Sequence, residues 1–286
     1  MTARQVHDRR RERASPAVAT ATALAALIGL FLGLPVAVLV GRALLDGQLG
    51  ASLVRLTVLD ALTLSLATTS ASLVVTIGLG TPLAYLLARH RFRGASIIET
   101  LVDLPIVLPP SVAGLALLLV FGRRGLVGEP LESVGIGVAF TTVAVVLAQT
   151  FVAAPFYIRS ARAGFAAVDP DLEDAARVDG AAEAQVARHV TVPLAASALA
   201  AGLVMSWARA LGEFGATIMF AGNLEGVTQT LPLVVYAEFQ AGDLDASIAA
   251  AAILVVAAFG VLVAVRALHW GRALDLRAGS PAPGRS

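Results

Sequence analysis

Long apolar stretches alternate with short charged segments along this chain of 286 residues. A helix needs about 20 apolar residues to cross roughly 30 Å of hydrocarbon. Lipid offers no partners to open backbone groups, so such stretches are expected to be helical. The windows without Asp, Glu, Lys or Arg predict six transmembrane helices. They lie at 14–41, 61–88, 104–122, 133–158, 189–208 (continuing past Glu213) and 246–265.

The first apolar stretch follows the basic segment 1–13, an order that also occurs in secretory signal peptides. The apolar core of a signal peptide has about 7–15 residues, and the stretch 14–41 is much longer. We therefore expect an uncleaved first helix that stays in the membrane.

Two segments interrupt the simple helical pattern. Pro105, Pro109 and Pro110 fall within the third predicted helix, and each proline removes a backbone donor and crowds the preceding turn. Broken helices at membrane depth occur where the backbone faces protein or water, so an interfacial kink and a pathway-lining break are both open interpretations. The stretch 221–245 contains an apolar run at 231–236 that is too short to span, which predicts a short external helix or re-entrant loop.

Composition supports a membrane protein. Residues AVILMFWYC make up 57% of the chain, charged residues only 14%, and the mean hydropathy is +0.81. Soluble domains usually carry about 25% charged residues. A disordered chain, a disulfide-stapled secreted domain and an ordinary cytosolic enzyme are thereby excluded. The absence of cysteine and the scattered histidines predict no metal site, and we expect no cofactor and no nucleic-acid partner.

The arginines predict the orientation in the membrane, because cytoplasmic loops carry an excess of basic residues. If the N-terminus is cytoplasmic, 16 of the 21 basic residues fall in inside segments and four in outside segments. Both termini are therefore expected in the cytoplasm, and the chain is expected to be a multi-pass protein of the plasma (inner) membrane. The inside segments are 1–13, 89–98, 159–188 and 266–286.

The longest predicted cytoplasmic loop contains signals for two short helices. Asp169 followed by Pro170 is typical of a helix start, with a side-chain acceptor and then proline at the first helical position. Gly180 is placed to end that helix in the left-handed conformation. A second helix is expected at about 182–189, and Pro193 marks the return to the membrane.

The same loop resembles the EAA motif of permease subunits of binding-protein-dependent ABC importers. The family pattern is an acid and two alanines, three residues, glycine, nine residues, and then apolar–any–apolar–proline. Aspartate stands here where glutamate is usual, and valines replace the common isoleucine and leucine. The matching residues are Asp174, Ala175, Ala176, Gly180, Val190, Val192 and Pro193.

This resemblance implies an all-α membrane protein with six transmembrane helices, the ABC importer permease fold (MetI-like) and cytoplasmic coupling helices within 159–194. It implies a permease domain at 57–268, preceded by an extra helix and external loop within 1–56 and followed by a tail at 269–286. The loop would seat in a separate cytoplasmic ATPase dimer, and a second permease copy and an external substrate-binding protein would complete the transporter. No G-x-x-x-x-G-K-[ST] sequence is present, so the chain is not expected to be an enzyme itself.

Two further stretches resemble molybdate permeases. They are LPIVLPPSVAGLALLLVFGRRGLVGE from Leu104 and WARALGEFGATIMFAGNLEGVTQTLPLVVY from Trp207. The resemblance implies molybdate as the transported oxyanion, and tungstate is not separable from it by sequence. Sulfate and thiosulfate permeases share the ARALGE-F/Y-G part and form the alternative. An ion-coupled secondary transporter is a further alternative that leaves the loop motif unexplained.

The candidate pathway residues are Pro109, Pro110, Arg209 and Glu213. Arg209 and Glu213 lie four residues apart on one helix face, within reach of each other. An ionisable residue inside the membrane is a functional candidate, so Arg209 could contact the passing oxyanion. The other interpretation is a pair that neutralises itself and fixes helix packing. We favour the second, because an unpaired strong anion site would retain a substrate that has to leave.

Overall fold

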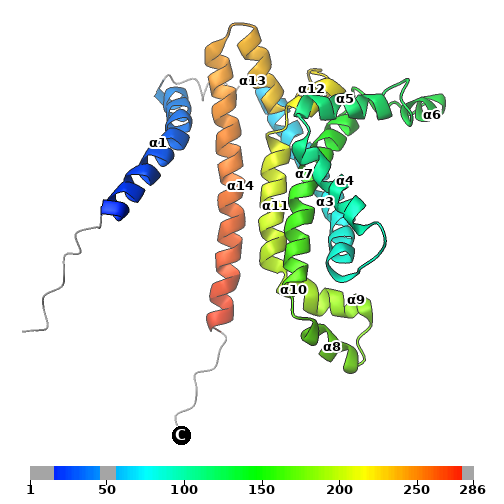
Figure 1. Cartoon of the computed structure of the whole chain (residues 1–286). Coiled ribbons are helices and arrows are strands. Elements are labelled where there is room, and N and C mark those ends of the chain that lie inside the picture. The colour runs from blue at the N-terminus through cyan, green and yellow to red at the C-terminus, as the bar shows by residue number, and fades with distance from the viewer. Residues whose placement is uncertain (1–15, 46–55, 279–286) are drawn as a thin grey trace, which may run out of the picture.

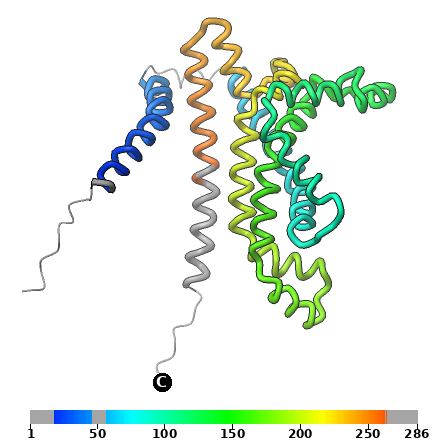
Figure 2. Tube along the Cα trace, in the orientation of Figure 1, coloured from blue at the N-terminus to red at the C-terminus, as the bar shows by residue number. Residues whose placement is uncertain are grey.

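The computed structural model describes residues 16–45 and 56–278, and every regular element in them is a helix (Figure 1). The expected all-α architecture is thereby confirmed for these residues. Figure 2 marks in grey the segments whose placement is uncertain. The basic segment 1–13, Arg55 and the end of the tail, 279–286, lie outside the described residues.

Four described helices are long and apolar enough to cross a membrane without a break. The second and sixth predicted spans, 61–88 and 246–265, lie within two of them, and the first overlaps a third. These four helices are α1 (Pro16–Leu45), α3 (Leu56–Arg89), α7 (Thr142–Ala166) and α14 (Leu244–Ala278).

Two bent helix pairs raise the number of candidate spans in the described residues to six. The axis turns by 119° between α4 (Ala95–Val107) and α5 (Pro110–Phe121). It turns by 74° between the segment Glu183–Leu194 and α11 (Ala196–Leu211). The six predicted apolar segments therefore correspond to four unbroken helices and two bent pairs.

The third predicted span has the wrong boundaries. Residues 104–122 do not form one helix, because the chain is extended at Leu108 and α5 starts at Pro110. Pro105, by contrast, is accommodated inside α4. Helix α4 begins at Ala95 and includes the charged Glu99 and Asp103. A span defined by the absence of charge starts only after Asp103 and therefore misses the first part of this helix.

The fourth predicted span, 133–158, is displaced relative to α7. The segment before α7 contains the short α6 (Gly128–Ser133) and a turn in which Gly135 has a φ of +82°. Thr141 caps α7, its hydroxyl oxygen accepting a hydrogen bond from Ala144 N at 3.3 Å. Hydropathy alone does not separate the apolar residues of that turn from the helix that follows.

The fifth predicted helix does not continue past Glu213. It ends at Leu211, and a separate short helix, α12 (Gly215–Phe220), follows the break. The expected short helix after it is confirmed as α13 (Leu231–Gln240), which forms a hairpin with α14 (Figure 1).

Helix α7 lies between α3 and α11 and is the centre of the bundle (Figure 1). Hydroxyl and amide groups join α7 to α3 along its length: Gln149 Nε2 lies 3.4 Å from Thr69 Oγ1, and Tyr157 Oη lies 2.6 Å from Thr81 Oγ1. Such hydrogen bonds hold helices together where the surroundings are apolar. The two helices therefore form one packed unit, whereas α1 packs against α14.

Candidate functional site

Helix α8 (Pro170–Val178) begins the loop that carries the sequence motif, and it starts as predicted. Asp169 is its N-cap, with Oδ1 accepting a hydrogen bond from Asp171 N at 3.0 Å, and Pro170 occupies the first helical position. Both features satisfy or remove backbone donors that a helix start leaves without intrahelical partners. Sequence reasoning therefore located this helix start correctly.

The end of α8 is fixed by Gly180, whose φ is +89°. The N–H of Gly180 donates to Arg177 O and the N–H of Ala181 donates to Ala176 O, both at 3.0 Å. This pair of bonds is the Schellman arrangement, which favours glycine because a side chain is strained in the left-handed conformation. The predicted role of Gly180 in ending the helix is confirmed.

The second helix of the loop is not a uniform α-helix. It begins as α9 (Glu183–Val186), continues as a π-helical turn η1 (Ala187–Thr191) and ends as α10 (Val192–Leu194). The N–H of Val192 donates to Ala187 O, five residues back. Pro193 has no N–H to complete an α-helical ladder, so the wider turn accompanies the proline.

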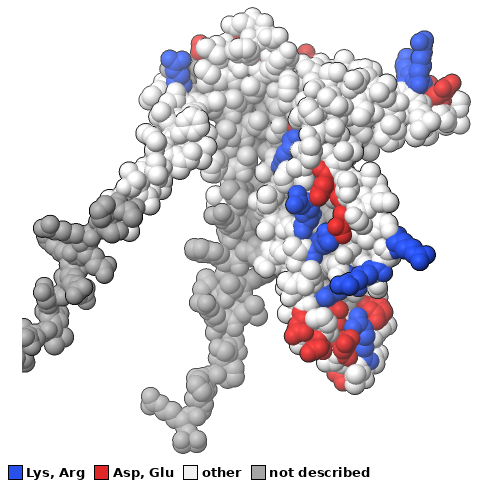
Figure 3. All heavy atoms as spheres, in the orientation of Figure 1, with Lys and Arg blue, Asp and Glu red and all other residues white. Residues whose placement is uncertain are grey.

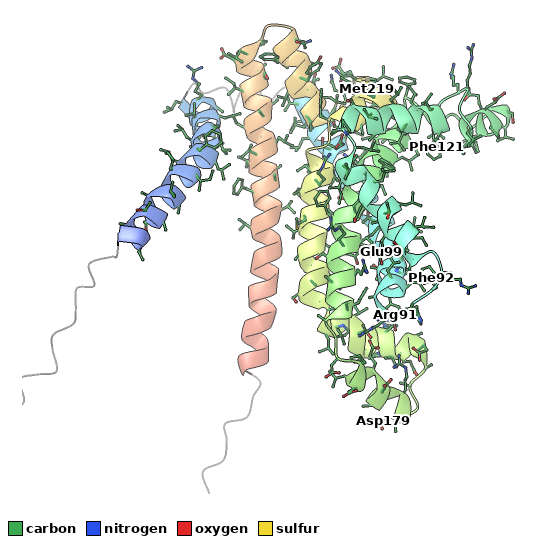
Figure 4. All side chains as sticks on the ribbon, viewed as in Figure 1. Arg91, Phe92, Glu99, Phe121, Asp179 and Met219 are labelled. Atoms are coloured by element: carbon green, nitrogen blue, oxygen red, sulfur yellow. The ribbon has the colours of Figure 1, made fainter. Side chains whose placement is uncertain are left out.

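The two halves of the spaced motif come together in one shallow hollow. Ala176 and Gly180 line it from the first half, and Val190 lines it from the second, with His189 between them. The chain reversal at Gly180 brings Val190 back beside the glycine, which accounts for the nine-residue spacer. Ala175 and Pro193 are exposed but do not line this hollow, and Figure 4 places Asp179 at the tip of the loop.

Arg177 bridges α8 and α9 on the exposed side of the loop. Its Nε donates to Glu183 Oε1 at 2.7 Å and its Nη1 donates to Asp174 Oδ1 at 2.6 Å. The hydrogen bond from Arg177 lowers the pKa of Glu183, and the same bonds raise the pKa of Arg177. Asp174, the acid of the motif, is therefore an exposed residue that a partner could reach. Figure 3 shows the charged tip to which it belongs.

Glu173 is the residue that the sequence analysis missed. It is 3% exposed and is the buried residue of α8. Its Oε1 accepts hydrogen bonds from Arg89 Nη2 at 2.7 Å and from Thr191 Oγ1 at 2.6 Å. Arg89 Nη2 also donates to Val168 O at 3.0 Å. The loop is thus joined to the end of α3 through a buried ion pair. The only sequence signal was an arginine ending the second span.

At the end of α11 away from the loop, helix α5 crosses α12. Pro109 and Pro110 start α5, and Gly215 starts α12. A β carbon on Gly215 would lie 2.7 Å from Pro110 Cβ, and one on Gly114 would lie 2.5 Å from Ala216 O. The absence of a side chain at both glycines therefore permits this close crossing. Figure 4 labels Met219, whose Cβ would lie 2.8 Å from the β carbon added to Gly114.

Arg209 and Glu213 form an ion pair beside this crossing. Their atoms Nη1 and Oε2 lie 2.5 Å apart, with the Glu213 side chain 1% exposed and that of Arg209 28% exposed. Glu213 Oε1 also accepts a hydrogen bond from Ala216 N at 2.7 Å. The pair therefore fixes the start of α12 and leaves one side of the guanidinium accessible. The pathway residues and the loop residues stand at opposite ends of α11 and do not form one site.

Comparison with known proteins identifies the family. The model of the "binding-protein-dependent transport system inner membrane component" matches residues 80–271. The molybdenum transport system permease protein ModB of Mycobacterium tuberculosis is 46% identical over 207 residues, 72% of this chain and 78% of that protein. The sulfate transport system permease protein CysT of Salmonella typhimurium is 35% identical over 190 residues, 66% and 69% of the two chains.

A solved structure shares the fold. It is a bacterial ABC transporter involved in the import of the acidic polysaccharide alginate, with a TM-score of 0.70 and 17% sequence identity. The match covers 88% of this chain and 94% of that chain. The expected ABC importer permease fold is thereby confirmed.

Proposed function

Because this chain belongs to the family of binding-protein-dependent transport system inner membrane components, we propose that it is the membrane-spanning permease subunit of an ATP-driven molybdate importer. The 46% identity to a molybdenum permease over 207 residues carries the substrate assignment, since the sulfate permease is more distant at 35%. The family consists of permease subunits, so ATP hydrolysis belongs to another polypeptide.

The partner ATPase contacts the loop helices, defined here as residues 169–194. The hollow lined by Ala176, Gly180 and Val190 and the exposed Asp174 support this assignment, because they present the motif on one accessible tip. ATP-driven closure of two ATPase subunits would draw two such tips together and move the attached helices as rigid bodies. The result is alternating access to the substrate from the two sides of the membrane.

The remaining parts of the transporter follow from this assignment. The loop helices and both termini face the cytoplasm, and the crossing of α5 and α12 faces outward, where an external binding protein delivers the anion. A second copy of the chain completes the permease, with residues 57–268 as its transmembrane domain. The excess of arginine on the proposed inner side supports this orientation.

Pro109, Pro110, Arg209 and Glu213 lie at the proposed outer part of the pathway. The buried carboxylate of Glu213 supports a packing role for the pair, because it binds both Arg209 and the start of α12. Selectivity is then set mainly by the external binding protein. Arg209 retains an accessible side and is the residue by which a contact with the anion can be tested.

The second candidate is a sulfate or thiosulfate permease. The shared stretch from Ala208 to Gly215 and the relative at 35% identity favour it over unrelated substrates. Tungstate is nearly the same tetrahedral dianion as molybdate and is treated with it.

The deciding experiment reconstitutes the permease with its ATPase and binding protein in proteoliposomes and measures uptake of molybdate, tungstate and sulfate. Binding of each anion to the binding protein is measured in parallel. We expect ATP-dependent uptake of molybdate that is not inhibited by excess sulfate. Preferred sulfate uptake would establish the second candidate. Uptake driven by an ion gradient without ATP would contradict both and indicate a secondary transporter.

A further inference from the structure

Helix α3 reaches from one end of the bundle to the other without a break. Its 34 residues correspond to about 50 Å at roughly 1.5 Å per residue. In Figure 1 it runs from the neighbourhood of α13 to the level of the loop helices. Arg89, its last residue, and Ser65, in its third turn, each make a polar contact with a segment far away in the sequence. Helix α3 is therefore a candidate for carrying a movement across the membrane.

The first contact is the junction of Arg89 with Glu173. Every other residue of α8 is exposed or half-buried, so the buried anchor of this helix is a carboxylate and not an apolar side chain. Apolar residues of similar volume often stabilise a protein as well as a buried ion pair does. What hydrogen-bonded charges add is a defined geometry, because Arg89 can contact Glu173 and Val168 O together in few positions.

The second contact is the junction of Ser65 with α13. The Ser65 side chain is fully buried, and its Oγ accepts a hydrogen bond from the N–H of Leu231 at 2.8 Å. Leu231 is the first residue of α13, where a helix has no intrahelical acceptor for its N–H groups. Beside it, Val58 and Ala61 pack against Leu231 and Val234. The start of α13 is thereby fixed to α3.

We propose that α3 is the element that links the ATPase-contacting loop to the outer segment at α13, with Glu173 as the positioning residue at the inner junction and Ser65 at the outer one. This inference rests on the proposed function. A displacement of α8 is passed to α3 by the Arg89–Glu173 pair and reaches the N-terminus of α13 through Ser65. In the reverse direction, docking of the loaded binding protein on the outer face displaces α13, and α3 transmits this displacement to the loop that contacts the ATPase.

Spatial intermediacy alone does not establish coupling, so the test must measure it. The complete transporter is reconstituted with its ATPase, and ATP hydrolysis is measured with and without molybdate-loaded binding protein. Glu173→Gln and Ser65→Ala are compared singly and together. Ser70→Ala, which removes an exposed hydroxyl of the same helix as Ser65, is the matched control.

We expect both single variants to lose most of the stimulation by the binding protein, at least threefold relative to wild type. Ser65→Ala, which lies outside the ATPase-contacting loop, should keep basal ATP hydrolysis. The double variant should lose no more than the stronger single one, because both changes interrupt one connection. The control Ser70→Ala should remain stimulated like wild type.

Wild-type stimulation in Glu173→Gln or in Ser65→Ala overturns the inference, and so do additive losses in the double variant. If Glu173→Gln fails to assemble, Ser65→Ala carries the test alone, because it lies about 36 Å along the helix from Arg89 at roughly 1.5 Å per residue. A wild-type transporter that shows neither molybdate uptake nor stimulation refutes the proposed function instead, so the two failures are distinguishable.

Discussion

Gly215 lies directly against Pro110, where helix α5 crosses α12. A β carbon at Gly215 would stand 2.7 Å from Pro110 Cβ, closer than side-chain atoms approach each other. The proline ring is rigid, so the helices themselves would have to move. The crossing of α5 with α12 therefore depends on the absence of one methyl group.

Gly215→Ala should lower the stability of the protein by about 1–3 kcal/mol, the usual cost of forcing extra volume into a packed contact. Thermal unfolding of the purified protein in detergent measures this change. The control is Gly78→Ala within α3, where nothing lies within 4 Å of the added carbon and helix propensity favours alanine. Equal unfolding temperatures for the two variants would contradict the close crossing.

Arg209→Ala should destabilise the protein strongly, because it leaves the buried carboxylate of Glu213 without its counter-ion. Breaking one side of such a pair costs about 3–5 kcal/mol. Combining Arg209→Met with Glu213→Gln removes both charges and should restore most of the stability. We expect this double variant to transport molybdate. A folded double variant without uptake would show that Arg209 acts on the anion itself.

Gly180→Pro should abolish ATP-driven uptake while the protein remains in the membrane. Proline fixes φ near −65°, whereas Gly180 has a φ of +89° and donates its N–H to Arg177 O. Gly180→Asn is the matched control, since asparagine tolerates this conformation and should keep uptake. Asp174→Lys, which reverses an exposed charge, should also block uptake. Normal transport by both single variants, Gly180→Pro and Asp174→Lys, would show that this loop does not form the contact with the ATPase.

The contact between Arg177 and Glu183 should depend on pH. Because the folded pKa of Glu183 is lowered by the hydrogen bond from Arg177, the bond stabilises the loop above the ordinary glutamate pKa of about 4.3. This stabilisation is lost as pH falls through the lowered value. A carboxyl-carbon NMR titration should give Glu183 a pKa below that of an ordinary glutamate, and Arg177→Gln should raise this pKa. An unchanged titration in Arg177→Gln would contradict the assignment. The effect on stability should be small, because the pair is exposed.

Cysteine labelling can test the proposed orientation, because the chain contains no natural cysteine. Leu126→Cys and Val178→Cys place thiols at positions that are 83% and 87% exposed, at opposite ends of the molecule. In cells that express the permease without its ATPase, an impermeant maleimide should label Leu126→Cys directly and Val178→Cys only after permeabilisation. The reverse pattern would invert the orientation.

The sequence by itself determined the features that depend on neighbouring residues. Apolar stretches long enough to cross lipid located the candidate spans of the described residues, four unbroken helices and two bent pairs, because a candidate span needs only length and freedom from charge. Asp169, Pro170 and Gly180 located both ends of α8, because capping is satisfied within a few residues of the helix end. The spaced motif identified the family for the same reason, since its pattern lies within one loop.

Only the tertiary structure decided which polar groups are buried together and which helices cross. Glu173 and Asp174 are adjacent acids in the sequence. Glu173 alone is buried, because Arg89 lies 84 residues earlier yet only 2.7 Å away. The close contact of Pro110 with Gly215 likewise depends on helices that pack from distant parts of the chain. Local patterns fix the elements, whereas desolvation and pairing are properties of the assembled bundle.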